Sequence, residues 1–265
     1  MGRGIPELER ATDQRRGGPR QPGKARWVAW LVHLYTASGA VLGFLAARSI
    51  LEGEFRSAFL WLFAATLIDA SDGWLARVVR VREHLPHVDG ARLDDLVDYL
   101  TYVFVPALLL HEAAMLPAGW DVVVPGAILL SSAYGFARTD AKSIGRVRAG
   151  DRGHAHEHLY RGFPSYWSIV ALYLYAAGTP PGLNAVVLLL LCGLVFVPIR
   201  FVYPTRTRAV RTLTLGLCTA WGAAMLVLIW QLPGVSTSLL VGSLAFPLYY
   251  TVLSMVLHAR RATSG

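Results

Sequence analysis

Cysteine and charged residues are scarce in this chain of 265 residues. The two cysteines, Cys192 and Cys218, each lie inside an apolar run. The sequence therefore has no disulfide framework, and we interpret both thiols as small buried hydrophobes. Charged residues make up only 16% of the chain, whereas hydrophobic residues make up 54%. Soluble domains carry about a quarter charged residues, and the mean hydropathy here is +0.44. The composition excludes an ordinary soluble domain and indicates a membrane protein.

The first 24 residues lack the apolar stretch of a signal peptide and are rich in Arg, Gly and Pro. We predict that residues 1 to 24 form a disordered basic tail and that residues 25 to 262 form a transmembrane domain. The net charge of +8 favours anionic lipids or phosphates as partners. No pattern of basic and stacking aromatic residues on a soluble module supports nucleic-acid binding.

Apolar stretches of about 20 residues, enough to cross roughly 30 Å of hydrocarbon, recur along the chain. Their ranges are 27 to 49, 57 to 80, 93 to 114, 120 to 138, 163 to 178, 183 to 201, 210 to 231 and 235 to 258. The predicted fold class is therefore an all-α membrane protein, a polytopic bundle of about eight transmembrane helices.

Basic residues indicate how such a bundle is oriented. With eight spans, all Lys and Arg residues except Arg48 and Arg56 fall in the two tails and in alternate loops on the same side of the membrane. By the positive-inside rule, that side is the cytoplasm. Both termini are therefore predicted to be cytoplasmic.

Four aspartates stand out at the cytoplasmic ends of the second and third stretches. Asp69 and Asp72 are three residues apart and Asp94 and Asp98 are four apart, so each pair shares one face of a helix. Ionisable side chains in membrane helices are costly and normally face a polar cavity or a partner. Two such faces together would form a cage of carboxylate oxygens, which suits two Mg²⁺ or Mn²⁺ ions.

Small and basic residues accompany the aspartates. Gly73 and Ala76 leave room beside Asp72, and Arg77 offers a guanidinium to phosphate oxygens. Gly90 lies where the third helix is expected to begin, and the amino end of a helix favours anions. Divalent ions beside a phosphate-binding arginine are typical of metal-assisted phosphoryl transfer.

These residues resemble the motif of the CDP-alcohol phosphotransferases, membrane enzymes that make phospholipids. The motif here reads Asp69-x2-Asp72-Gly73-x2-Ala76-Arg77-x12-Gly90-x3-Asp94-x3-Asp98. The usual spacing between the arginine and the second glycine is eight residues. The twelve-residue spacing, with eight rather than six spans, is similar to the bacterial branch that uses choline. The stretch from Tyr160 to Trp167 and the run from Phe196 to Pro204 are also similar to that branch.

The resemblance implies transfer of the phosphatidyl group from CDP-diacylglycerol to choline in the bacterial inner (cytoplasmic) membrane, with CMP released. Two Mg²⁺ or Mn²⁺ ions would be bound by Asp69, Asp72, Asp94 and Asp98, with Asp98 also the catalytic base. The CDP-diacylglycerol site would be lined by Gly73, Ala76, Arg77 and Gly90, with Lys142 near the phosphates. Choline, a quaternary ammonium, is usually held by aromatic faces. Tyr166 and Trp167 are the aromatic residues predicted to hold it. Similar enzymes are commonly homodimers.

Other interpretations remain open at this point. The same chemistry could serve another acceptor, such as serine, inositol phosphate or glycerol phosphate. A transporter would be expected to show inverted repeats, and the last four apolar stretches contain no second acidic cluster. His154, His156 and His158 lie in a loop that we interpret as solvated, and we interpret His33 as an interfacial polar residue.

Overall fold

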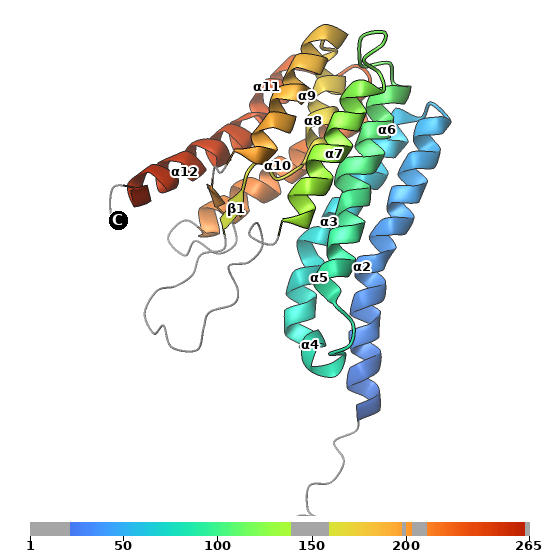
Figure 1. Ribbon diagram of the computed structural model, residues 1–265, viewed down its shortest axis with the longest axis vertical. Coiled ribbons are helices and arrows are strands. Elements are labelled where there is room, and N and C mark those ends of the chain that lie inside the picture. Colours follow the sequence, from blue (N-terminus) through green and yellow to red (C-terminus); the bar gives the residue numbers. More distant parts are fainter. Residues whose placement is uncertain (1–21, 139–158, 198–199, 203–210, 263–265) are drawn as a thin grey trace, which may run out of the picture.

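The structure is a computed structural model that describes residues 22–138, 159–197, 200–202 and 211–262. Helices account for most of these residues (Figure 1). Their bounds are α2 (Pro22–Leu51), α3 (Phe55–Val79), α4 (Val81–His84), α5 (Gly90–Asp98), the π-helical segment η1 (Tyr99–Phe104), α6 (Val105–Glu112), α7 (Val123–Ala137), α8 (Trp167–Ala177), α9 (Pro181–Phe196), α10 (Arg211–Gln231), α11 (Thr237–Ser243) and α12 (Ala245–Ala262). Two short strands, β1 (Leu159–Arg161) and β2 (Arg200–Val202), pair antiparallel.

The helical class predicted from composition is confirmed apart from this strand pair. Each predicted apolar range contains most of one helix or of consecutive helices, the third α5, η1 and α6 and the last α11 and α12, whereas the range 183 to 201 also extends past α9 into β2. Among the described residues, three helices are long and apolar enough to cross a membrane, namely Gly23–Leu51, Phe55–Val79 and Thr212–Gln231. Shorter apolar helices occupy Val123–Ala137, Trp167–Ala177, Pro181–Phe196 and Thr237–Leu253. The number of spans, eight, and the side of the termini stay predictions.

Several helix boundaries differ from the prediction, among them those of α2, α8 and α9. Residues 22 to 24, assigned to the disordered tail, belong to α2, and the rest of that tail lies outside the described residues. Helix α8 begins only at Trp167, because Pro164 has no backbone N–H and Ser165 has a left-handed φ of 56°. Helix α9 ends at Phe196, since Val197 precedes a proline and is extended (φ −78°, ψ 128°).

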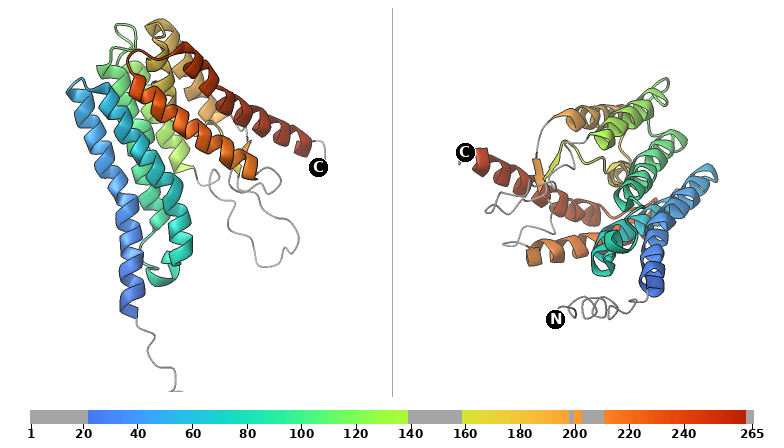
Figure 2. Two further views of the ribbon diagram at one scale, coloured as in Figure 1. Left: turned by 180° about the vertical axis from the view of Figure 1, so that it is seen from behind. Right: turned by 60° about the horizontal axis from the view of Figure 1, so that its bottom comes forward.

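Helices α2 and α3 form the antiparallel pair that carries the site (Figures 1 and 2). Helix α5 packs beside α2, and the short helix α4 closes the connection between α3 and α5. A glycine brings α2 and α5 together, because a Cβ atom at Gly39 would lie 2.6 Å from Cγ1 of Val97. The hairpin and α5 therefore hold their motif residues at close range.

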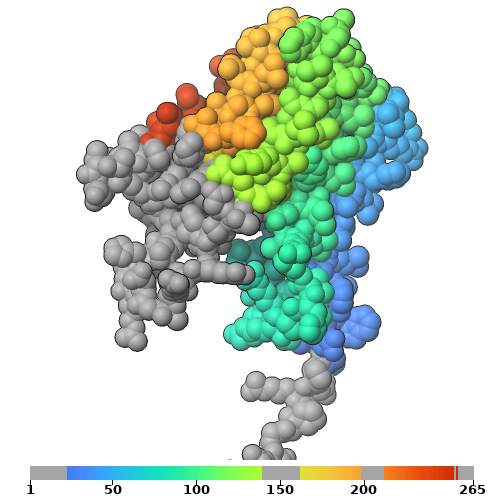
Figure 3. All heavy atoms as spheres, viewed as in Figure 1, coloured from blue at the N-terminus to red at the C-terminus, as the bar shows by residue number. Residues whose placement is uncertain are grey.

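The main apolar core is formed by residues of α2 and α3 together with η1, α6, α7, α8, α9 and α10. Its fully buried side chains include Val103, Leu109, Ile128, Leu188 and Leu228. Outward-facing apolar side chains are also abundant, and much of the face in Figure 3 belongs to α6, α7 and α9. Extensive exposed apolar surface of this kind marks contact with lipid or with another protein, as expected of membrane helices.

Candidate active site

Three of the four motif aspartates converge where α3 meets α5. One carboxylate oxygen from each of Asp69, Asp94 and Asp98 lies within 4.8 Å of the other two. Unit charges about 4 Å apart repel each other by roughly 4 kcal/mol at an effective dielectric constant near 20, so the ionised cluster strongly favours a cation. Carboxylate oxygens are the ligands that hard divalent cations prefer. The cluster can therefore hold a metal ion.

Asp72, the fourth predicted ligand, lies outside this group of three. Its carboxylate is buried and accepts a hydrogen bond of 2.8 Å from the hydroxyl of Thr36 on α2. Asp72 nevertheless lines the same small cavity. The residues around that cavity are Thr36, Ala65, Ile68, Asp69, Asp72, Asp94, Val97, Asp98 and Thr101. Helix α2 therefore contributes to the site through Thr36, a residue that motif spacing did not identify.

Tyr102 connects the aspartates to the predicted choline residues. It belongs to η1, which begins directly after Asp98, and π-helical turns are frequent at functional sites. Its hydroxyl donates a hydrogen bond of 2.8 Å to Oδ2 of Asp69. Its ring meets the ring of Tyr166 edge to face, with centroids 5.7 Å apart. Tyr166 is therefore connected to the aspartate cluster through a single residue, Tyr102.

Tyr166 and Trp167, paired in the prediction, have different environments. The side chain of Tyr166 is 41% exposed, whereas Trp167 has no exposed surface. The indole Nε1 of Trp167 donates a hydrogen bond of 2.7 Å to the hydroxyl of Ser132, and its ring packs against Phe163. Only Tyr166 of this pair offers a surface to a ligand in this conformation.

The side chain of Arg77 lies close to Gly73 and Asp72 on α3. A Cβ atom at Gly73 would lie 3.4 Å from Nη1 of Arg77, so the arginine side chain passes beside the glycine one turn back along α3. From there the guanidinium attracts the carboxylate of Asp72. Arg77 therefore lies beside Gly73 and near Asp72, where it can meet a phosphate.

The other two small motif residues contact α2. Ala76 packs against an apolar cluster that includes Ala29 and Val32 of α2, and Gly90 lies against the imidazole of His33. Two amides at the start of α5 are already bonded, because the Asp89 carboxylate accepts from the backbone N–H groups of Ala91 and Arg92. The Asp89 side chain therefore already occupies two of the N–H groups at this helix end that were expected to bind an anion.

Some predicted features cannot be placed. Lys142 and the loop with His154, His156 and His158 lie outside the described residues. His33, interpreted as an interfacial residue, is buried at 7% exposure, and that interpretation was wrong. A single sequence gives the spacing of residues along α2 but not the rotation that turns His33 and Thr36 toward α3 and α5.

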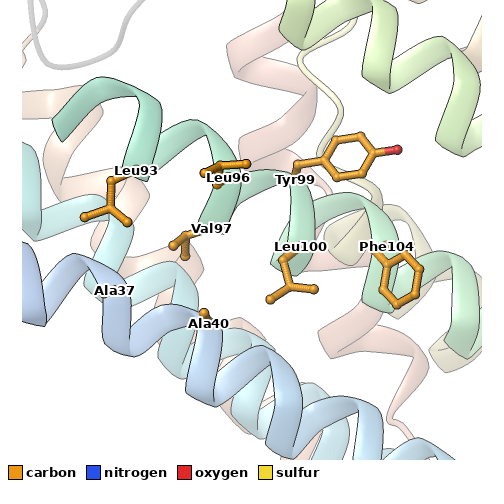
Figure 4. Close-up of a pocket in the computed structure, with 8 residues that line it drawn as sticks. All are labelled: Ala37, Ala40, Leu93, Leu96, Val97, Tyr99, Leu100 and Phe104. Atoms are coloured by element: carbon orange, nitrogen blue, oxygen red, sulfur yellow. The ribbon is translucent and has the colours of Figure 1, made fainter. Parts of the chain in front are cut away.

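An apolar groove runs beside the aspartate cavity, between α2 and the α5–η1 segment (Figure 4). Its volume is about 450 Å³. It is lined by Ala37, Ala40, Leu93, Leu96, Val97, Tyr99, Leu100 and Phe104. Val97 lines both the groove and the aspartate cavity. A polar and an apolar compartment are therefore adjacent, as a lipid substrate requires.

Comparison with known proteins identifies close relatives. A phosphatidylcholine synthase of Legionella pneumophila is 43% identical over 182 residues, 68% of this chain and 66% of that protein. One of Pseudomonas aeruginosa is 36% identical over 77% of this chain and 81% of its own length. One of Rhizobium meliloti is 35% identical over 86% of this chain and 90% of its own length.

No model of a protein family matches the sequence. The relatives nevertheless suffice to assign the chain, because the similarity extends over most of its length at more than 30% identity. With the acidic cluster between α3 and α5 and the apolar helices around it, they lead to one conclusion: the chain belongs to the phosphatidylcholine synthase family.

Proposed function

We propose that this protein transfers the phosphatidyl group of CDP-diacylglycerol to choline, giving phosphatidylcholine and CMP, at the cytoplasmic face of a bacterial inner membrane. The observation that carries the proposal is the convergence of Asp69, Asp94 and Asp98 in a chain of this family. Arg77 beside Asp72 adds a cationic group for the phosphates.

Asp98 is the proposed general base. Its carboxylate accepts the hydroxyl proton of choline as the choline oxygen bonds to the phosphorus that carries diacylglycerol. The bond from that phosphorus to the oxygen of CMP breaks, and CMP departs with the electron pair. Arg77 would orient the phosphates, and divalent ions held by the carboxylates would supply charge stabilisation during the transfer.

Two divalent cations, Mg²⁺ or Mn²⁺, are proposed as cofactors. Asp69, Asp94 and Asp98 fit one ion as they stand. Asp72 lines the same cavity and completes the set for a second, with Thr36 holding its carboxylate in place.

Choline is proposed to bind against Tyr166. This ring is partly exposed and contacts Tyr102, whose hydroxyl bonds to Asp69. An ammonium over this ring gains cation–π attraction, and its hydroxyl end can then point toward Asp98. Trp167, which is buried and bonded to Ser132, is assigned a supporting role in positioning Tyr166.

The apolar groove in Figure 4 is proposed to hold an acyl chain of CDP-diacylglycerol. Because Val97 lines both compartments, a lipid with its diphosphate at the aspartates can place a chain directly in the groove. Because the chain leaves lipid rather than water, its contacts with the groove are van der Waals packing rather than hydrophobic transfer. The groove would thus contribute to the affinity for the nucleotide lipid.

The proposed topology keeps eight spans with both termini in the cytoplasm, and a homodimer stays a prediction. Reporter fusions test the topology. A reporter after Ala262 should behave as cytoplasmic and one inserted near Gly119 as periplasmic. A periplasmic carboxyl terminus would mean an odd number of spans and would undo this placement of the aspartates, and a cytoplasmic reporter near Gly119 would put them on the periplasmic side.

The function is tested with the purified full-length chain in lipid nanodiscs, CDP-diacylglycerol and a panel of labelled alcohols. Choline, serine, inositol phosphate and glycerol phosphate are compared as acceptors. We expect phosphatidylcholine and CMP in equal amounts, with choline preferred. Preference for another acceptor would keep the chemistry and overturn the choline assignment, whereas inactivity with all four would overturn the function.

A further inference from the structure

His33 is a buried polar residue without an assigned role. Its side chain lies on α2 at 7% exposure, and its Nε2 atom has no hydrogen-bond partner among the residues that the structure describes. A buried polar atom left unpaired carries the full cost of its lost contact with water. Such an atom in a native structure is expected to have a partner that binds to it.

The space around His33 is created by a motif glycine. A Cβ atom at Gly90 would lie 2.9 Å from Cε1 and 3.5 Å from Nδ1 of the imidazole, closer to Cε1 than a real Cβ atom is found. Gly90 was expected to line the nucleotide site directly. In the structure its missing side chain makes room for the ring of His33.

Along α2, His33 lies one turn from the aspartate site. It precedes Thr36 by three residues, so the two share one face of α2, and Thr36 donates to the carboxylate of Asp72. One turn earlier, Ala29 packs in the apolar cluster that includes Ala76. On α2, His33 therefore lies between Ala29, which packs in the cluster with Ala76, and Thr36, which bonds to Asp72, and its ring faces Gly90.

We propose that His33 positions the nucleotide lipid by donating a hydrogen bond from Nε2 to a phosphate oxygen of its diphosphate. This inference rests on the proposed function. A phosphate oxygen is an anionic acceptor, and the diphosphate must lie next to the carboxylates that bind the cations. His33 is thus a positioning residue, and Gly90 acts through it.

Three substitutions separate hydrogen bonding from packing. His33→Gln places an amide nitrogen near the position of Nε2, His33→Asn places one near Nδ1, and His33→Leu keeps an apolar side chain. We measure CMP binding directly, by calorimetry with Mg²⁺ present, and the KM for each substrate in nanodiscs. CMP carries a phosphate without the lipid, so its binding does not depend on turnover.

The His33→Leu and His33→Asn proteins are expected to bind CMP roughly tenfold or more weakly, as loss of a hydrogen bond to a charged group implies. The KM for CDP-diacylglycerol should rise in parallel, with the KM for choline unchanged. His33→Gln should weaken CMP binding less than His33→Asn does. Equal CMP affinity in all three variants and the parent, as when only water meets Nε2, would overturn the inference.

A double variant tests the link to Gly90. Gly90→Ala should reduce the yield of folded protein and CMP affinity, because the added methyl meets the imidazole. Adding His33→Ala should restore the yield but not CMP affinity. A Gly90→Ala protein with unchanged CMP affinity would overturn the link.

Failure of the proposed function is distinguishable. A parent protein that binds CMP but forms no phosphatidylcholine would overturn the choline reaction and leave the role of His33 standing. If the parent forms phosphatidylcholine but the His33→Leu protein binds CMP as tightly as the parent, the choline reaction stands and the role of His33 is overturned.

Discussion

The region from α2 to α5 and the region from α8 to α12 are built from similar apolar helices but differ in how their polar groups are used. In the first, three carboxylates converge and a fourth accepts a hydrogen bond from Thr36. After Glu157 the sequence contains no Asp or Glu. There, neutral side chains bond to one another, as Tyr173 does with Ser243 and Thr214 with Tyr249.

This difference distinguishes polar groups that serve the proposed reaction from polar groups that stabilise helix packing. Neutral hydrogen bonds between helices satisfy buried hydroxyls and stabilise packing by modest amounts. A carboxylate cluster instead adds electrostatic repulsion that packing does not require. The first region is therefore the proposed reaction centre, and the second is the support that brings Tyr166 to it.

The strongest way to break this comparison is to neutralise the proposed base. Asp98→Asn should lower the rate of phosphatidylcholine formation by about 100-fold or more, since general bases contribute 10²–10⁴-fold. The measurement is kcat in nanodiscs at saturating Mg²⁺. Asp95→Asn, the same change on the same helix at a residue outside the group of three, is the matched control and should retain activity.

The contribution of the second region is tested at Tyr166. Tyr166→Ala removes a ring whose attraction to a desolvated ammonium is worth on the order of 2 kcal/mol, so the KM for choline should rise roughly thirtyfold. Trp167→Phe, which removes the bond to Ser132 but keeps a buried ring, should lower thermal stability with little change in that KM. An unchanged choline KM in Tyr166→Ala would place the pocket elsewhere.

The same substitution, Thr→Val, can be made at one hydrogen-bonded threonine in each region, which compares the two regions directly. Thr36→Val removes a hydrogen bond to a carboxylate, and kcat/KM should fall roughly tenfold, because bonds to charged groups are worth about 1.5–3 kcal/mol. Thr214→Val removes a bond to the neutral Tyr249 hydroxyl in the second region. It should change only the melting temperature, and equal losses of activity in both variants would contradict the division of roles.

The smallest expected effect concerns the groove. Ala40→Phe should fill part of it and raise the KM for CDP-diacylglycerol a few-fold, because it removes some packing contacts with the acyl chain and the others are retained. Ala223→Phe on α10, at an exposed position, is the control. A KM that is unchanged for long-chain substrates would remove the groove from the lipid site.

The sequence was sufficient for the helical class and for the convergence of three of the four aspartates. Their spacing of three and four residues predicts shared faces, and the structure brings Asp69, Asp94 and Asp98 together. It was not sufficient for Thr36, because a hydroxyl in a long apolar helix most often bonds within its own helix. The burial of Trp167 also depends on its contact with α7, which no local pattern specifies.

The contact of Gly90 with His33 could not be predicted for the same reason. A glycine four residues before Asp94 is readable as space for a ligand, but which group fills that space depends on how α2 is rotated against α5. In the structure the imidazole of His33 faces it. Residue spacing thus predicts which residues share a face of one helix. It does not predict which residues of two helices contact each other, because that depends on how the helices pack.

The central claim is that the carboxylate cluster binds the divalent cations required for phosphatidyl transfer. The most direct test is a titration of metal-depleted protein with Mg²⁺ and Mn²⁺, following phosphatidylcholine formation in the parent and in Asp94→Asn. We predict no activity after chelation, full recovery in the parent, and a requirement for at least tenfold more metal in the variant, since one anionic ligand is lost. Activity that survives chelation, or the same metal dependence in both proteins, would contradict the account.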